Sequence, residues 1–334
     1  MHIHKNVWLV WLFSGMIFVA PLGMAAEKEL TAEQMVSAME NTFGMNSGAR
    51  RNHTKGTCAA GEFVGLPEAG KYTRSLLFSG KSVPVVARFS MPGGNPKVPD
   101  TAKIPRGMAL EFDLSDGSLQ HMTMLSTPMF GAAFPQTVFD DIVSKKPDPT
   151  TGKPDPEKIK VFKASHPDNL PQAEFLAKNN PPISWANSSY FGIHTFKFIN
   201  RKKKTTLVRW RFVPQDGEKR MSEDEIKSAP PNFLESKLLE RVQQDPVRWD
   251  MILTIGVAGD VEDNPTLLWP SERKEVKIGT LTISSAMPQK GAECEKINFD
   301  PLVLADGIEP TNDPVLLFRS PAYAISWGKR IGGD

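Results

Sequence analysis

Short apolar runs dominate the chain from Val83 onward, and they limit its fold more than any other feature of the sequence. The runs are continuous or alternating, and Gly, Pro and Asp-Gly separate them, which is typical of β-strands joined by turns. Strands are predicted at residues 83–90, 108–114, 122–126, 194–200, 206–213, 249–257 and 275–284. The basic run at residues 201–204 lies between two of these strands and is interpreted as a hairpin turn rather than a binding patch.

Helical patterns precede, interrupt and follow these strands. The first begins at Thr31, whose spacing to Gln34 is that of a capping box, and runs to about Phe43. Further helices are predicted at residues 157–165, 170–179, 232–244 and 314–330, the last with a local irregularity at Pro321. Strands, then helices, then strands again predict an α+β fold in which helices surround an antiparallel β-barrel. We find no internal repeat and no clear linker.

The first residues have the pattern of a secretory signal peptide. A short basic start precedes an apolar run from Val7 to Ala20, and small residues follow it. Cleavage is expected after Ala25 or Ala26, which assigns residues 1–25 to the leader and 26–334 to a single domain. A retained anchor is the weaker alternative, because about 14 apolar residues fall short of the roughly 20 that a span needs. The mature chain is therefore expected to be periplasmic or secreted, with no membrane partner.

The charge balance and the cysteines bear on several classes of protein. A net charge of +2 gives no electrostatic case for a nucleic-acid partner. The chain has no Cys-x-x-Cys-His for covalent haem and no His-Glu-x-x-His, and its six histidines are scattered, which argues against a zinc site. Cys58 and Cys294 are permitted to form a disulfide in an exported protein, but the sequence alone does not pair them.

A tyrosine near the C-terminus has the surroundings of an iron ligand. Arg319 precedes Tyr323 by four residues, and none of the three tyrosines except Tyr323 has an arginine in this position. A tyrosine binds ferric iron as phenolate, whereas a free phenol has a pKa of about 10, so an arginine one helical turn away is placed to stabilise the charged form. An arginine four residues before a tyrosine, taken alone, is more often found on the surface of a helix than in a metal-ligand set. Its meaning depends on a second block near residue 50, which contains His53 and looks like the other side of a haem pocket.

The order of motifs along residues 50–333 resembles that of the catalase-related peroxidases, members of the catalase superfamily reduced to a haem-binding core. The matching blocks are Arg50-x-x-His53-x-Lys55-Gly56, Arg88-Phe89-Ser90, Pro105-Arg106-Gly107-Met108-Ala109, Thr127-Pro128-Met129-Phe130, Gly192-Ile193-His194-Thr195-Phe196-Lys197, Asn264-Pro265-Thr266, Trp269-Pro270, Phe299-Asp300-Pro301, Gly307-Ile308-Glu309-Pro310, Asp313-Pro314, Arg319, Tyr323 and Arg330. The resemblance implies a catalase-type antiparallel β-barrel with surrounding helices, and haem b buried between the barrel and the C-terminal helix.

The resemblance also assigns roles to individual residues. His53 matches the distal catalytic histidine, and Ser90 matches the hydroxyl that orients it. Tyr323 matches the axial ligand of the haem iron, and Arg319 matches the arginine beside its phenolate. Further matches are a polar relay behind the phenolate, His194 and Asp313, and the arginines that bind the haem propionates, Arg50, Arg88 and Arg330.

Three features depart from the pattern of full catalases. The asparagine that positions peroxide in typical catalases falls on Leu125, which has no donor, and Ser126 beside it would need the strand to reorient. The histidine usually found four residues after the axial tyrosine is Trp327. The chain also stops soon after Arg330, without the wrapping and C-terminal domains. Weak catalase activity and easier access for organic donors are therefore expected.

The resulting prediction is a haem-dependent peroxidase that reduces hydrogen peroxide, or organic hydroperoxides, with small organic electron donors. The O–O bond would break heterolytically with His53 as acid–base, and a monomer or small homo-oligomer is expected. The alternatives are a minimal true catalase, a catalase-like protein acting on lipid hydroperoxides, an exported haem-binding or haem-storage protein, and a cofactor-free β-barrel binding module. Retention of His53 and Ser90 argues against storage, and Tyr323 with its three arginines argues against the cofactor-free module.

Overall fold

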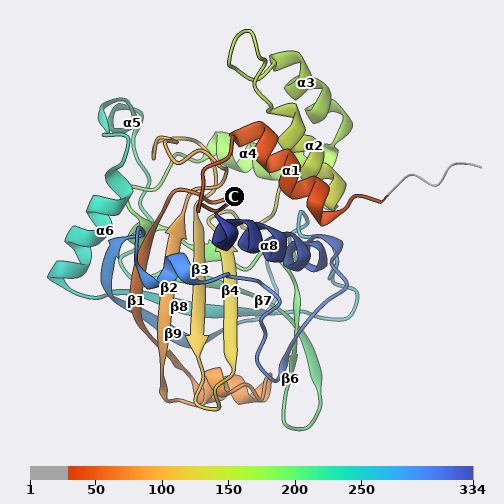
Figure 1. The fold of residues 1–334 in the computed structure, drawn as a ribbon. Helices are drawn as coiled ribbons and strands as arrows, with labels where there is room; N and C mark the ends of the chain where they lie inside the picture. Colours follow the sequence, from red (N-terminus) through yellow and green to blue (C-terminus); the bar gives the residue numbers. More distant parts are fainter. Residues whose placement is uncertain (1–28, 334) are drawn as a thin grey trace, which may run out of the picture.

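The computed structural model describes residues 29–333 and contains a ten-stranded antiparallel sheet (Figure 1). The signal peptide predicted at residues 1–25 lies outside the described residues. The strands are β1 Gly56–Gly65, β2 Ser82–Ser90, β3 Gly107–Asp113, β4 Leu119–Leu125, β5 Tyr190–Phe191, β6 Phe196–Ile199, β7 Thr205–Pro214, β8 Val247–Ile255, β9 Glu275–Pro288 and β10 Ile308–Pro310. The sheet order is β10-β6-β7-β5-β4-β3-β2-β1-β9-β8, and a further pairing of β7 with β8 closes a barrel of eight strands from which β6 and β10 extend.

Aromatic side chains fill the inside of the barrel. Phe63, Phe89, Phe112 and Trp249 are fully buried, and their rings meet at short range, with centroids 5.5 Å apart for Phe63 and Phe112 and 5.8 Å apart for Phe89 and Trp249. Each such side chain removes a large apolar area from water, and edge and offset ring contacts add to the stabilisation. Because the interior is packed, a ligand site has to lie outside the barrel wall.

The helices are α1 Ala32–Phe43, α2 Pro135–Ser144, α3 Pro156–Ser165, α4 Leu170–Lys178, α5 Glu223–Ser228, α6 Phe233–Gln244, α7 Glu293–Lys296 and α8 Pro314–Gly332, with short 3₁₀ helices at Pro67–Lys71, Leu76–Phe78, Pro167–Asn169 and Trp185–Asn187. Figure 1 shows α8 lying across the barrel near the ends of β2 to β4, with α1 and α2 above it. Met35 of α1 and Ile142 of α2 form a small apolar cluster that Phe318 of α8 packs against.

The predicted α+β architecture is confirmed, and most of its elements lie where the sequence places them. The capping box of α1 is present, since Thr31 and Gln34 exchange side-chain to backbone hydrogen bonds at 3.2 and 2.8 Å. The basic run forms the turn between β6 and β7, where Lys203 has a positive φ of 60°. Helix α8 continues through Pro321.

Six strands and α-helices escaped prediction, namely β1, β5, β10, α2, α5 and α7, and for the two longest of them, β1 and α2, the reason is identifiable. Strand β1 is rich in Gly and Ala, with few of the β-branched or aromatic residues that signal a strand, yet it pairs along its whole length with β2 and β9. Helix α2 begins at Pro135 and follows residues 126–134, in which Pro128 and Gly131 are typical of a loop. Both elements are held by tertiary contacts.

A disulfide joins Cys58 of β1 to Cys294 of α7, with their Cα atoms 5.6 Å apart. Both cysteines are buried beside Phe299, so the bond fixes the segment between β9 and β10 against the outer face of the barrel. The sequence permitted this pair and the structure makes it.

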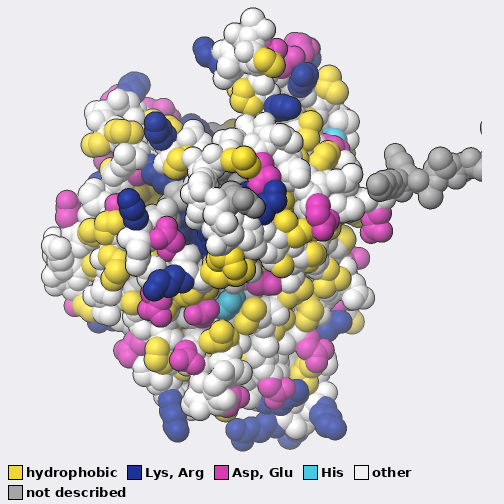
Figure 2. Space-filling view, viewed as in Figure 1, with side chains coloured by type: hydrophobic (Ala, Val, Ile, Leu, Met, Phe, Trp, Pro, Cys, Tyr) yellow, Lys and Arg dark blue, Asp and Glu magenta, His cyan; other side chains and the backbone are white. Residues whose placement is uncertain are grey.

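Charged side chains of both signs are spread over the face of the molecule seen in Figure 2, and basic side chains gather at its lower edge. Within residues 29–333, no helix has the length and apolar character needed to cross a membrane. No three His, Cys, Asp or Glu side chains in that same stretch converge as a metal-binding group would.

Candidate active site

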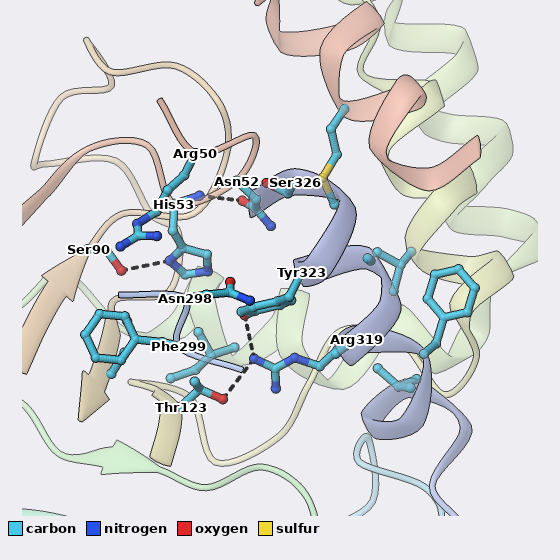
Figure 3. A pocket seen from close by; sticks show the side chains of 18 of the residues that line it. Arg50, Asn52, His53, Ser90, Thr123, Asn298, Phe299, Arg319, Tyr323 and Ser326 are labelled. Carbon is cyan, nitrogen blue, oxygen red and sulfur yellow. Dashed lines mark hydrogen bonds between the residues drawn. The ribbon is translucent and has the colours of Figure 1, made fainter. Parts of the chain in front are cut away.

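A cavity of about 1270 Å³, counted together with its open mouth, lies between the outer face of β2 to β4 and helices α8 and α1 (Figure 3). Its walls are largely apolar, and the polar side chains occur in a few groups. The lining includes Met35, Met39, Arg50, Asn52, His53, Arg88, Ser90, Gly107, Thr123, Leu125, Phe130, Val138, Asn298, Phe299, Phe318, Arg319, Tyr323 and Ser326. This is the space that the resemblance predicts for haem, between the barrel and the C-terminal helix.

Strand register places part of this lining in two rows. Ser90 pairs with Gly107, and Gly107 pairs with Leu125, so these three residues form one row across β2, β3 and β4. The next row on the same face contains Arg88, Ala109 and Thr123. Side chains alternate along a strand, so the residues between these rows point into the barrel core while the rows face the cavity.

His53 lies at one side of the cavity and is oriented by a strand residue. Its Nδ1 is 2.9 Å from Ser90 Oγ, which leaves Nε2 as the ring nitrogen available to a ligand. A Cβ atom on Gly107 would lie 2.7 Å from Ser90 Oγ and 3.0 Å from His53 Nδ1. Glycine is therefore required in β3 to leave room for the His53–Ser90 pair.

The backbone of His53 is strained and firmly held. Its φ is 55°, a left-handed conformation that non-glycine residues adopt at a cost of about 1–3 kcal/mol when the surroundings impose it. Asn52 Oδ1 accepts from the backbone N–H of His53 at 2.8 Å and from that of Gly93 at 2.6 Å. Arg88 Nη2 donates to the carbonyl oxygen of His53 at 2.7 Å. These bonds fix the direction in which the imidazole enters the cavity.

The His53 imidazole is neutral across the ordinary pH range. Burial lowers its pKa to about 3, and the positive charges of Arg88, Arg319 and Arg50 act in the same direction. A neutral imidazole has one nitrogen with a free lone pair, so it is able to accept a proton from a ligand bound in the cavity.

Tyr323 lies on the opposite side of the cavity, and Arg319 supports it from the preceding turn of α8. Arg319 Nη2 donates to the phenolic oxygen of Tyr323 at 2.9 Å and to Thr123 Oγ1 at 2.9 Å. A guanidinium that donates to a phenolic oxygen favours the phenolate, which is the form that binds ferric iron. The four-residue spacing of Arg319 and Tyr323 thus brings their side chains into direct contact.

Behind Arg319, two buried side chains complete a chain of hydrogen bonds. Arg319 Nη1 is 3.0 Å from His194 Nε2, and His194 Nδ1 is 2.7 Å from Asp313 Oδ2. Arginine only donates, so Nε2 accepts and Nδ1–H donates to the carboxylate, which describes a neutral imidazole. Burial lowers the pKa of His194 although Asp313 opposes the shift. The other oxygen of Asp313 caps α8 by accepting from the backbone N–H groups of Val315 and Leu316.

Two buried arginines, Arg88 and Arg330, and the half-buried Arg50 gather at one end of the cavity with little negative charge to balance them. Burial and the other two guanidiniums lower the pKa of Arg50 to about 8, burial with Arg330 lowers that of Arg88 to about 9, and burial lowers that of Arg330 to about 10. Arg50 donates to the carbonyl oxygens of Cys294 and Ile297 at 2.7 and 2.9 Å. Arg330 Nη1 is buried without a hydrogen-bond partner among the described residues.

This arginine cluster fits the two carboxylates of a haem. A buried guanidinium with an unpaired donor is costly, and a planar carboxylate is the group that its donor fork matches. The apolar walls suit a porphyrin ring, and Tyr323 provides the phenolic oxygen for iron. All seven residues that the sequence predicted for catalysis and cofactor binding belong to this region, and His194 and Asp313 lie directly behind it.

The structure also adds residues for which the sequence analysis gave no role. Thr123 receives a bond from Arg319, Gly107 makes room for Ser90, and Gln289 Oε1 accepts from Arg88 at 2.6 Å. Asn52 and Asn298 bring side-chain amides to the cavity wall. Only Gly107 had a signal in the sequence, as part of a matched block, because the others depend on contacts between distant segments.

Two of the departures from the catalase pattern are visible at the site. Leu125 lines the cavity at the end of β4 and offers no hydrogen bond. Trp327 stacks under Arg330, whose Cζ lies 4.2 Å from the ring centroid, so the tryptophan supports one of the clustered arginines.

A barrel with a histidine facing an arginine-supported tyrosine, and with arginines at the end of the cavity between them, defines a haem-dependent oxidoreductase. Comparison with known proteins gives the particular family. A family model described as catalase matches residues 34–334. The chain belongs to the catalase family, and it is an enzyme of the haem peroxidase type.

Named relatives and solved structures agree with this family. A catalase-related peroxidase from Synechococcus elongatus is 58% identical over 334 residues, 98% of each chain, and one from Mycolicibacterium paratuberculosis is 33% identical, over 91% of this chain and 96% of the relative. The fold is that of catalase A from Saccharomyces cerevisiae, with a TM-score of 0.79 and 23% identity. That match covers 86% of this chain and 62% of the yeast one.

Proposed function

We propose that the chain is an exported peroxidase that reduces hydrogen peroxide, or an organic hydroperoxide, with electrons from small organic donors. The observation that carries the proposal is the meeting of His53 and Tyr323, from opposite ends of the chain, at one cavity with an arginine cluster. Haem b is the proposed cofactor because the chain has no Cys-x-x-Cys-His for covalent attachment.

The proposed haem contacts follow from the cavity lining. Tyr323 would hold the iron through its phenolate, and Arg50, Arg88 and Arg330 would hold the propionates. When bound, the haem supplies the iron redox chemistry that cleavage of an O–O bond requires. Arg319 donates a hydrogen bond to the Tyr323 oxygen, and the hydrogen bonds that link Arg319 to His194 and His194 to Asp313 fix the direction of the guanidinium.

His53 moves the proton in the proposed reaction. Its neutral ring would take a proton on Nε2 from one oxygen of a peroxide bound in the cavity, while Nδ1–H is held by Ser90. The same nitrogen then returns the proton to the other oxygen, which leaves as water or as an alcohol. Haem storage alone would need neither the imidazole nor the hydroxyl, so the pair supports an enzyme over a haem carrier.

The proposed electron donors follow from the apolar distal side. Reduction by a second peroxide molecule needs a polar group to hold that molecule, and Leu125 supplies none. The open mouth of the cavity lets an aromatic or other small organic donor approach. We therefore propose strong peroxidase activity with weak catalase activity; a minimal true catalase is the alternative.

The proposed location is the periplasm or the exterior of the cell, and the proposed unit is a single domain acting as a monomer or small homo-oligomer. The signal-peptide pattern and the Cys58–Cys294 disulfide both support export, since such bonds persist in oxidising compartments.

One pair of measurements tests the function. Purified protein with bound haem is given peroxide in an oxygen electrode and, at the same haem concentration, in a chromogenic donor assay. We expect little oxygen and clear donor oxidation. Rapid oxygen evolution with almost no donor oxidation would favour the minimal catalase, and an optical spectrum unchanged by peroxide would favour a haem carrier.

A further inference from the structure

The side chain of Asn52 has a fixed orientation beside the proposed catalytic histidine. Its Oδ1 accepts from two backbone N–H groups, those of His53 and Gly93, at 2.8 and 2.6 Å. Backbone N–H groups only donate, so the atom that they contact has to be the amide oxygen and not the amide nitrogen. The Asn52 amide therefore cannot turn over without losing both bonds.

The Nδ2 group of Asn52 is consequently left on the side of the amide away from these bonds. Among residues 29–333 it has no hydrogen-bond partner, and Asn52 lines the cavity. Figure 3 shows the Asn52 side chain at the cavity wall, near His53 and above the ring of Tyr323. Two N–H donors with no protein acceptor thus border the cavity beside His53 (Figure 3).

The surroundings make such a donor effective. Leu125, Phe130 and Val138 line the same cavity and compete for no hydrogen bond. Asn52 is exposed in the structure, but its amide is held by two bonds, so the donor needs no rearrangement when charge develops on a bound oxygen. The bonds that fix the amide also hold His53 in its left-handed conformation, so the donor and the base move as one unit.

We propose that Asn52 orients the peroxide, donating from Nδ2 to a peroxide oxygen while Oδ1 holds His53 in place. This inference rests on the proposed peroxidase function and adds a substrate-contacting residue to it. No proton leaves the amide, because it acts as a donor and His53 acts as the base.

The test distinguishes the Nδ2 donor from the two hydrogen bonds that Oδ1 accepts from the backbone. Asn52→Asp keeps an oxygen acceptor for both backbone N–H groups and removes the donor, whereas Asn52→Ala removes both. Asn95→Asp is the matched control. Asn95 Oδ1 also accepts from a backbone N–H, that of Lys97 at 2.9 Å, and Asn95 is outside the cavity lining, while the change adds the same negative charge. For each variant we would measure thermal unfolding of the haem-free protein, fluoride affinity of the ferric haem-loaded protein, and the rate of its reaction with peroxide.

The expected pattern differs for each variant. Asn52→Asp should unfold within about 2 °C of wild type yet react with peroxide on the order of 10²-fold more slowly, the effect of losing one such donor. Its fluoride affinity should fall as well, because fluoride accepts from the same donor. Asn52→Ala should show the slow reaction and a lowered unfolding temperature, and Asn95→Asp should retain a rate within a few-fold of wild type.

Two results would overturn the inference. A rate and a fluoride affinity for Asn52→Asp within about three-fold of wild type would show that the amide contacts neither ligand. An equal loss in Asn95→Asp would assign the effect to charge alone. In either case the proposed peroxidase function would still hold if the wild-type protein oxidises donors with peroxide. A wild-type protein that does not react with peroxide would contradict the proposed function as well.

Discussion

The guanidinium of Arg319 lies 2.9 Å from the phenolic oxygen of Tyr323, one turn later on the same helix. Arg319 also contacts Thr123 of the barrel and His194, so its direction is set by three elements at once. This geometry gives the phenolic oxygen a fixed positive partner on the side away from the cavity centre, and several predictions depend on it.

Replacing Tyr323 with phenylalanine should abolish haem binding. The ring and its packing remain in Tyr323→Phe, but the oxygen that would bind iron is lost. The measurements are haem stoichiometry after reconstitution and the charge-transfer band of the ferric protein. Tyr72→Phe serves as a control, because Tyr72 is outside the lining of this cavity and should bind haem normally. Full haem content in Tyr323→Phe would refute the assignment.

Asp313→Asn should separate helix capping from the polar relay. Asparagine is also a good N-cap, so stability should change little, whereas Asp313→Ala should cost about 1 kcal/mol or more. The amide NH₂, however, would face Nδ1–H of His194 and force the ring to change tautomer, which places an N–H against Arg319. We expect a weaker Arg319–Tyr323 bond, seen as a shifted charge-transfer band. An unshifted band would mean that the relay does not act on the phenolate.

His53→Ala should leave haem bound but slow the reaction with peroxide by about 10²–10⁴-fold, the usual contribution of acid–base catalysis. Stopped-flow mixing measures the rate. In the wild type, the pKa of about 3 keeps His53 neutral, so the rate should stay level from neutral pH until the acid range. A rate that falls by half near pH 6.5 would show an ordinary, solvated histidine.

The same pKa predicts an effect on stability. The folded pKa of His53 lies below its unfolded value of about 6.5, so between about pH 3 and 6.5 the unfolded chain binds more protons at this residue. Its contribution to the free energy of unfolding is therefore present above pH 6.5 and declines as the pH falls. Haem-free wild type should lose more stability on acidification than haem-free His53→Ala, and identical pH profiles would contradict this.

Leu125→Asn should raise the catalase rate more than the peroxidase rate. The amide restores a donor at the end of β4, where a second peroxide molecule would bind, and one such donor is typically worth about 10²–10³ in rate. Oxygen evolution and donor oxidation are compared at matched haem concentration. Leu125→Met keeps the site apolar and is the control. Equal gains in both activities, or in neither, would count against the proposed cause of weak catalase activity.

Removing the disulfide should weaken the arginine cluster. The carbonyl oxygens of Cys294 and Ile297 hold Arg50, so the segment that Cys294 anchors also orients a proposed propionate ligand. The double variant Cys58→Ser, Cys294→Ser should lose about 2–5 kcal/mol of stability and release haem faster. Denaturant unfolding and transfer of haem to an acceptor protein measure the two effects. Unchanged haem release would limit the disulfide to a role in stability.

Local patterns in the sequence determined much of this protein. Alternating apolar runs gave most barrel strands, Thr31 and Gln34 began the first helix, and the spacing of Arg319 and Tyr323 on one helix placed their contact within a single turn. Such features depend on residues close together in the chain, where helical and strand periodicity fix the geometry.

Tertiary structure alone decided the remainder of the site. The register of β2, β3 and β4 places Ser90, Gly107 and Leu125 in one row, and no local pattern specifies that register. The same holds for the pairing of Cys58 with Cys294 and for the hydrogen bond from the Gly93 N–H to Asn52 Oδ1. These contacts join segments whose relative positions are set only when the barrel closes and the helices pack on it, because burial in a shared core, and not local propensity, fixes them.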